Sequence, residues 1–308
     1  ENFLKLKNTV RKIMRTLNIN KNFLAIEDKY SNYKDSKVVI LPVPYEATTS
    51  YGKGAAKGPA GIYNASHYVE FFDEELNREF CFEKGNGIAS LYPVKFNGAK
   101  GKKALDIIYN EVLKHIKNKK FVVTLGGEHT ISTAPIKAHF DNYKDLSILH
   151  FDAHSDLRDS YEGTKYSHAS FCARVAEFTK DITQVGIRAQ CKEEYEFIKK
   201  NKIKTFYAYA IRNGLHGKNW HEKVIKGLKK NVYITFDVDY FDPSIMSSTG
   251  TCEPLGFYWE ETIALLKKLG RQRKVVGFDV VELAPKKENP YPDFLTAKLI
   301  YKMLNYFL

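Results

Sequence analysis

The sequence predicts an α/β fold in which helices cover a mainly parallel sheet. Three observations support this fold class. Short runs rich in β-branched and aromatic residues recur along the chain, helical patterns lie between them, and polar residues follow directly after several of the runs. Runs that are apolar almost throughout are typical of strands buried on both faces, and their alternation with helices is typical of α/β layers.

The expected elements follow from these patterns. Seven segments are predicted as strands: 37–43, 120–127, 146–153, 182–187, 204–210, 231–239 and 274–282. Four segments have apolar residues at helical spacing and are predicted as helices: 101–118, 191–201, 220–230 and 258–270. Because no internal repeat and no linker rich in Pro or Gly interrupts the chain, we expect one domain over residues 1–308.

Residues 1–20 are predicted to add an amphipathic helix. Their apolar side chains recur at intervals of three or four, at Phe3, Leu6, Val10, Ile13 and Leu17. Packing against the protein body or a second subunit is the simpler role for such a helix, and contact with a membrane surface is the alternative. No apolar run approaches the ~20 residues of a membrane span. The four cysteines are widely spaced, which favours a reducing cytoplasm.

The chain has a formal charge of +12, which could indicate an anionic partner. Its lysines are scattered, however, and no nucleic-acid recognition motif accompanies them, so we expect solvated helix faces and no nucleic-acid partner. Residues 231–260 reverse this charge, with five acids and no Lys or Arg. This segment therefore marks a place where a cation could bind.

Acids and histidines stand where three of the predicted strands end. The set comprises His129, Asp152, His154, Asp156, Asp237 and Asp239. Side chains two positions apart share one side of an extended segment, so the acids and the imidazole after residue 151 point the same way. Since ligands of open parallel sheets bind beyond the carboxyl ends of the strands, we expect these side chains to converge.

Carboxylates gathered in this way repel one another and raise one another's pKa values unless cations bind among them. An oxygen-rich set with two imidazoles favours Mn²⁺ over zinc, and carboxylates can bridge two ions. Each piece alone has a simpler explanation: His129 could cap a helix, and Asp237 and Asp239 could form a turn with Asp242 and Pro243. Three such clusters at three strand ends together predict a dinuclear metal site.

Four segments resemble the ureohydrolase family of arginases and agmatinases: "GGEHT", "FDAHSD", "TFDVDYFDPS" and "GTCEP". The resemblance extends from "VVILPVPYEATTSYGKGAAKGPAGI" to "GFDVVELAP", and the residues before it match no motif of the family that we recognise. It implies a three-layer α/β/α sandwich with a parallel sheet. By analogy with family members, a homo-oligomer of three or six chains is expected.

The resemblance also implies a role for each ligand. His129 and Asp156 correspond to ligands of one Mn²⁺, His154 and Asp239 to ligands of the other, and Asp152 and Asp237 to the bridging carboxylates. Two Mn²⁺ ions lower the pKa of a water, which as hydroxide attacks the carbon of a guanidinium group. Asp156 is expected to accept a hydrogen bond from this nucleophile and orient it.

Two further residues match positions that act on the substrate in this family. His168, in "KYSHAS", matches the loop histidine and is expected to carry the proton to the leaving amine. Glu282 matches the glutamate that holds the guanidinium over the metals. Without the resemblance, His168 could be a loop residue bonded to the backbone, and Glu282 a surface residue.

The segments around the predicted site favour agmatine, a cationic guanidino compound, which is hydrolysed to putrescine and urea. After Asp156 come "LRD", "YEG" and "SHA", which resemble agmatinases, whereas arginases have a loop with an asparagine that binds the α-carboxylate of arginine. Glu253, in "GTCEP", also resembles agmatinases and is a candidate for substrate binding. Arg158 is a second candidate, which could bind a carboxylate or pair with Asp159.

Three residues depart from the family pattern. Cys252 and Leu255 replace the usual Pro and Gly, and Glu128 replaces the commoner Asp before the ligand histidine. Other activities stay open, namely hydrolysis of guanidinobutyrate, arginine or formiminoglutamate. A metal-binding regulatory protein without activity is the alternative from another class, and retention of all six ligands with His168 and Glu282 argues against it.

Overall fold

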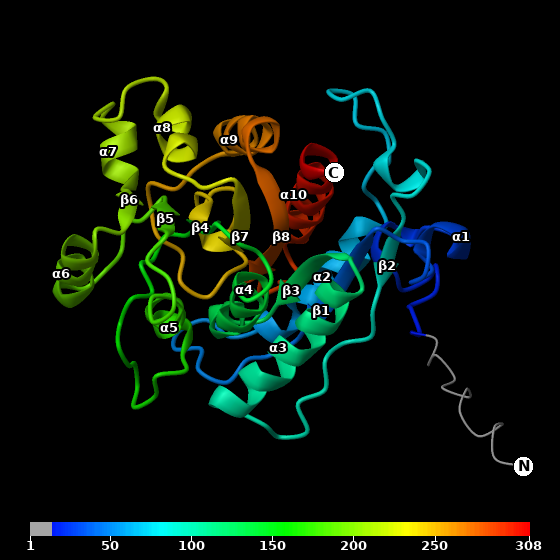
Figure 1. Cartoon of the computed structure of the whole chain (residues 1–308), viewed down its shortest axis with the longest axis horizontal. Helices are drawn as coiled ribbons and strands as arrows, with labels where there is room; N and C mark the ends of the chain where they lie inside the picture. Colours follow the sequence, from blue (N-terminus) through cyan, green and yellow to red (C-terminus); the bar gives the residue numbers. More distant parts are fainter. Residues whose placement is uncertain (1–13) are drawn as a thin grey trace, which may run out of the picture.

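The computed structural model describes residues 14–308, and its centre is one sheet of eight parallel strands (Figure 1). The strands lie in the order β2-β1-β3-β8-β7-β4-β5-β6. Their bounds are Val38–Val43 (β1), Ile88–Ser90 (β2), Phe121–Gly126 (β3), Leu146–Phe151 (β4), Ile182–Val185 (β5), Lys204–Phe206 (β6), Asn231–Asp237 (β7) and Lys274–Val281 (β8). All seven predicted strands are present, but the one predicted over 204–210 ends at Phe206, and its residues 208–210 are helical instead. The short edge strand β2 was not predicted.

Helices cover both faces of this sheet, which gives the three expected layers (Figure 1). The core on one face includes residues of α2 (Gly58–Ser66), α7 (Ala208–Arg212), α8 (Trp220–Lys226), α9 (Trp259–Gln272) and α10 (Tyr291–Phe307). The core on the other includes residues of α3 (Gly101–Lys117), α4 (Thr133–Phe140), α5 (Phe171–Val175) and α6 (Lys192–Asn201). The short α1 (Asp28–Ser31) precedes β1. The predicted α/β class and the four predicted helices, now α3, α6, α8 and α9, are confirmed.

The predicted N-terminal helix is wrong over the part that the structure describes. Its residues 1–13 lie outside the described residues, and residues 14–20 are not helical. Instead, Thr16 forms an isolated bridge with Leu91, and the amide of Leu17 donates to the carbonyl of Ser90 at 2.8 Å. The edge strand β2 leaves backbone groups unpaired, and this segment of chain satisfies one of them. Among residues 14–308, we find no helix long and apolar enough to span a membrane.

The functional region begins where the ends of strands β1 and β3 lie close together. Beyond β1 and β3, the amide of Gly127 donates to Val43 and that of Glu128 donates to Tyr45, at 3.0 and 2.9 Å. A Cβ atom on Gly127 would lie 1.9 Å from the carbonyl oxygen of Tyr45. Only glycine fits there, so the "GG" of "GGEHT" brings the chain past β1 and places His129 at the end of β3.

This contact gives a direct test of the fold around the site. Gly127→Ala is expected to lower the free energy of unfolding by about 3 kcal/mol, because backbone atoms on both sides would have to move. Gly98→Ala is the control, since that glycine has positive φ but open space around it; it should cost only about 1–2 kcal/mol. Urea unfolding monitored by circular dichroism measures both, and equal losses would contradict the steric explanation.

Candidate metal centre

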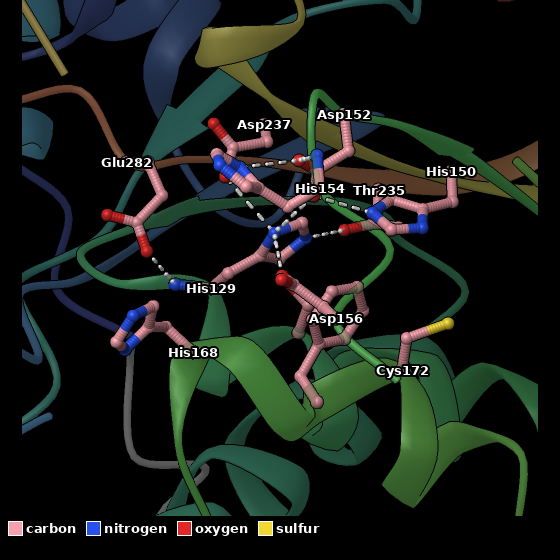
Figure 2. A network of polar contacts seen from close by, with 12 residues as sticks. His129, His150, Asp152, His154, Asp156, His168, Cys172, Thr235, Asp237 and Glu282 are labelled. Atoms are coloured by element: carbon pink, nitrogen blue, oxygen red, sulfur yellow. Dashed lines mark hydrogen bonds and ion pairs between the residues drawn. The ribbon is translucent and has the colours of Figure 1, made fainter. Parts of the chain in front are cut away.

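Four neighbouring strands of the sheet, β3, β8, β7 and β4, carry the functional side chains at their carboxyl ends. The pairing of β4 with β7 sets Phe151 opposite Phe236, so that Asp152 and Asp237 leave their strands at the same level. The structure brings all six predicted ligands together: His129, Asp152, His154, Asp156, Asp237 and Asp239. Figure 2 shows Asp152, His154, Asp156 and Asp237 around the ring of His129.

His129 faces three carboxylates. Its Nδ1 lies 3.1 Å from Asp152 Oδ2, 3.4 Å from Asp156 Oδ2 and 3.2 Å from Asp237 Oδ2. Within residues 14–308 this buried nitrogen has no hydrogen-bond partner of good geometry. The opposite nitrogen, Nε2, lies 2.9 Å from the hydroxyl of Thr235. One lone pair and three carboxylates therefore converge on a single region, as a metal ion requires.

The tautomer of His129 follows from the residues behind it. Thr235 donates its hydroxyl proton to Asp279 Oδ1 at 2.7 Å, so its oxygen is left to accept from Nε2 of His129. Asp279 is fully buried and also accepts from Ser132 and Tyr233, at 2.9 and 2.8 Å. Nε2 therefore carries the proton, and Nδ1 has the free lone pair that a metal ligand needs.

His154 forms the second half of the site. Its Nδ1 lies 2.9 Å from Asp239 Oδ2 and 3.5 Å from Asp152 Oδ1. Asp152 thus presents one oxygen to each histidine, which is the position of a bridging carboxylate. Asp237 lies between the two halves in a different way, since Oδ2 faces His129 while Oδ1 accepts from the backbone amide of Asp239 at 2.8 Å.

A third histidine, which the sequence analysis missed, holds Asp152 from behind. His150 is fully buried, and its Nε2 lies 2.7 Å from Asp152 Oδ2. Gln184 donates its amide to the other ring nitrogen at 3.1 Å, so Nε2 carries the proton and donates it to Asp152. His150 therefore supports a ligand. The sequence does contain a signal for this role, because His150 precedes Asp152 by two positions and therefore shares its side of the strand.

The charges of the site conflict without a cation. Burial, together with the charge of Asp152, raises the pKa of Asp156 to about 6. Burial and the neighbours Asp239 and Asp152 raise the pKa of Asp237 well above its ordinary value. Burial also opposes ionisation of Asp152, but His150 and His129 hold the pKa of this group well below its ordinary value. Carboxylates whose pKa values are shifted in opposite directions by burial and by one another fit a site for divalent cations.

Two of the site residues have a strained backbone. Asp156 has φ 52° and Glu282 has φ 64°, which are left-handed values that non-glycine residues seldom adopt. The carbonyl of Asp156 accepts from the amides of Cys172 and Ala173, at 3.0 and 3.2 Å. Glu282 Oε1 accepts from the amide of His129 at 2.5 Å, a bond drawn in Figure 2. The first two bonds fix the backbone of Asp156, and the third fixes the carboxylate of Glu282.

A cavity of about 280 Å³ opens above these groups. Its lining includes His154, Asp156, Arg158, His168 and Glu282. The predicted proton carrier and the predicted guanidinium partner therefore face the same space as the ligands. Burial raises the pKa of Glu282 well above its ordinary value, and the charge of Glu128 adds to this effect.

Arg158 lines this cavity, whereas Glu253 approaches it through a contact with His154. Arg158 belongs to its wall, with Nε 4.0 Å from Glu194 Oε2 and the guanidinium 5.4 Å from the centre of the Tyr161 ring. Asp159 binds Arg174 at 2.8 Å, so it is not the partner of Arg158. The carboxylate of Glu253 contacts His154, with Oε1 3.8 Å from Nε2.

The loop that bears Glu253 is tied to the ligand segment by Arg188, a second residue that sequence reasoning missed. Its Nη2 donates to the carbonyl oxygens of Asp239 at 2.7 Å and Glu253 at 3.1 Å, and Nη1 donates to that of Gly186 at 3.1 Å. In the same loop, Leu255 has φ 68° and is exposed. A left-handed conformation explains why glycine suits this position.

Comparison with known proteins identifies the family of this chain. The sequence model of the Arginase family matches residues 36–305. The chain belongs to the arginase family. It is 36% identical over 292 residues to the N(1)-aminopropylagmatine ureohydrolase of Synechocystis sp., which covers 93% of this chain and 94% of that protein. It is 34% identical over 263 residues to the agmatinase of Bacillus cereus, with 83% and 86% covered.

A solved structure supports the same relationship. The agmatine ureohydrolase of Thermoplasma volcanium superposes with a TM-score of 0.80 at 27% identity, covering 93% of this chain and 94% of that one. The chain therefore shares its fold with this solved relative over most of its length.

Metal binding should stabilise this protein measurably. With Mn²⁺ at about 100 times its dissociation constant, linkage predicts a gain of ~2.7 kcal/mol and a rise in Tm of about 5 °C or more. Asp237→Asn should abolish most of that rise, because it removes a carboxylate shared by both halves of the site. Asp106→Asn, on the exposed face of α3, is the matched control. Differential scanning fluorimetry with and without Mn²⁺ makes the measurement, and an undiminished shift in Asp237→Asn would contradict the assigned site.

Proposed function

We propose that this chain hydrolyses the guanidinium group of agmatine, giving putrescine and urea, with two Mn²⁺ ions as cofactors. The observation that carries the proposal is the pair of His/Asp groups that share Asp152 beneath one cavity. The similarity to enzymes named agmatinase and aminopropylagmatine ureohydrolase, over more than four fifths of the chain, supports the substrate class.

The residues fit two hard cations. His129 and Asp156 would hold one ion, His154 and Asp239 the other, and Asp152 and Asp237 would bridge them. A set with four carboxylates and two imidazoles is richer in oxygen than the usual zinc site, which favours Mn²⁺. When bound, the ions supply the Lewis acidity that activates water for attack on the guanidinium carbon.

Glu282 is suited to orient a cationic substrate. Its Oε1 is occupied by the amide of His129, so Oε2 is the oxygen left to accept hydrogen bonds from a guanidinium. Asp156, on the same cavity wall, can accept a hydrogen bond from the attacking water. Two acids on the cavity wall that are not metal ligands, Glu194 and Glu282, favour a cationic substrate.

The reaction requires the attacking water to lose both of its protons. A C–O bond forms between water and the guanidinium carbon, the C–N bond to the alkyl chain breaks, and the departing nitrogen takes up two protons to leave as an alkylammonium ion beside neutral urea. His168 is the carrier in this proposal. Burial lowers the pKa of His168 below its ordinary value, although the charge of Glu128 opposes this, so the ring is neutral and able to accept a proton at neutral pH.

N(1)-aminopropylagmatine is a second candidate substrate. It is favoured by relatives at 35–36% identity, from Synechocystis sp. and Thermus thermophilus, whose names specify that compound. Arg158 is the group that favours the anionic alternatives, because its guanidinium lines the cavity and has only a loose partner in Glu194. Arginine, guanidinobutyrate and formiminoglutamate would each have to place a carboxylate near it.

We expect urea release from agmatine or N(1)-aminopropylagmatine to exceed release from arginine by at least about 100-fold in kcat/KM, since a misplaced charged group in a buried site costs several kcal/mol. A urea assay with Mn²⁺ across these three substrates, guanidinobutyrate and formiminoglutamate makes the test. A preference for arginine, or equal rates, would overturn the proposal. Absence of urea from every substrate would favour a non-catalytic metal protein.

Three broader expectations stay predictions. They are a homo-oligomer of three or six chains, a cytoplasmic location, and the lack of a nucleic-acid or membrane partner.

A further inference from the structure

Glu128 is a buried carboxylate that the proposed reaction does not use. It stands beside the ligand His129 and is completely inaccessible to solvent. Its Oε2 accepts from the amides of Ala47 and Thr48, at 2.8 and 2.7 Å. Its Oε1 accepts from the hydroxyls of Thr48 and Thr130, at 2.8 and 2.7 Å. The acceptor positions of the carboxylate are thus filled by donors from two loops.

Thr48 connects this carboxylate to His168. A threonine hydroxyl has one proton, and Thr48 donates it in a hydrogen bond to Glu128. The oxygen is therefore left to accept, and two nitrogen atoms of His168 lie within reach of it. The backbone amide of His168 lies 3.2 Å away, and ring nitrogen Nδ1 lies 3.4 Å away. Thr130, which lies 3.3 Å from Thr48, has also given its proton to Glu128.

We propose that Glu128, acting through Thr48, fixes the tautomer of His168 with the proton on Nδ1, so that Nε2 is the atom that accepts and delivers the catalytic proton. This inference rests on the proposed function for the role of His168, but the tautomer itself does not depend on any substrate. Glu128 and Thr48 are positioning residues in this scheme, since neither of them moves the proton.

The surroundings of Nε2 agree with this assignment. Ser50, which lines the cavity, has its hydroxyl 3.3 Å from Nε2 and can donate to that lone pair. The edge of the ring also meets Tyr161, with the centres 5.6 Å apart. In the neutral ring, one nitrogen already carries a proton, and only the other nitrogen can accept one. A ring in the other tautomer would offer its lone pair to Thr48, away from the cavity wall at Ser50.

Nuclear magnetic resonance of ¹⁵N-labelled histidine tests the tautomer directly. The full-length protein is used with Mg²⁺, which does not broaden signals as Mn²⁺ does, and His168→Asn identifies the signals of His168. We expect Nδ1 to carry the proton in the unaltered protein. The variant Thr48→Val should shift the signals toward a mixture of tautomers, whereas Thr48→Ser should preserve them. A proton on Nε2 in the unaltered protein would overturn the inference, even if Thr48→Val failed to fold.

Kinetics provide the second measurement. Thr48→Val should lower kcat about 10-fold with KM changed less than about 2-fold, because the proton carrier loses its alignment while the guanidinium site is intact. Thr48→Ser, which keeps the hydroxyl, should restore kcat to within about 3-fold of the unaltered enzyme. An unchanged kcat in Thr48→Val would contradict the positioning role. If no guanidino compound is hydrolysed, the proposed function fails, and the resonance experiment still decides the tautomer.

Discussion

Mutual repulsion among buried carboxylates is the constraint on which this structure depends. Asp152, Asp156 and Asp237 each place an oxygen within 3.4 Å of one imidazole nitrogen, and Asp239 approaches a second imidazole. Such an arrangement costs free energy in a protein without cations. The fold offsets the cost with donors behind the site, from His150 and from backbone amides such as that of Asp239. The sheet, the glycine pair and the strained backbone all serve to keep these groups in place.

The sequence predicted the parts of the fold that depend on local pattern. Apolar runs located seven strands, and alternation with period two placed three ligands on one side of the chain after β4. What it could not supply were contacts between distant segments. The pairing of β7 with β8 sets Thr235 opposite Asp279, and that register fixes the tautomer of His129. Helix α10 was missed because most of its surface is buried, so its sequence lacks a polar stripe.

The two histidines nearest the chemistry are controlled in the same way. A threonine accepts from each ring because its own proton is committed to a buried carboxylate, Asp279 behind His129 and Glu128 behind His168. The first arrangement directs a lone pair toward the metals, and the second directs one toward the cavity. Replacement of the commoner Asp by Glu128 leaves the ligands in place, and here its carboxylate joins the loop at Ala47 and Thr48 to Thr130, next to the ligand His129.

The central claim is that the six ligands form one site for two ions. Anomalous X-ray diffraction at the manganese absorption edge, on crystals grown with Mn²⁺, tests it most directly. The account predicts two peaks, one beside His129 and Asp156 and one beside His154 and Asp239, with Asp152 and Asp237 between them. A single peak, or manganese bound away from these residues, would contradict it.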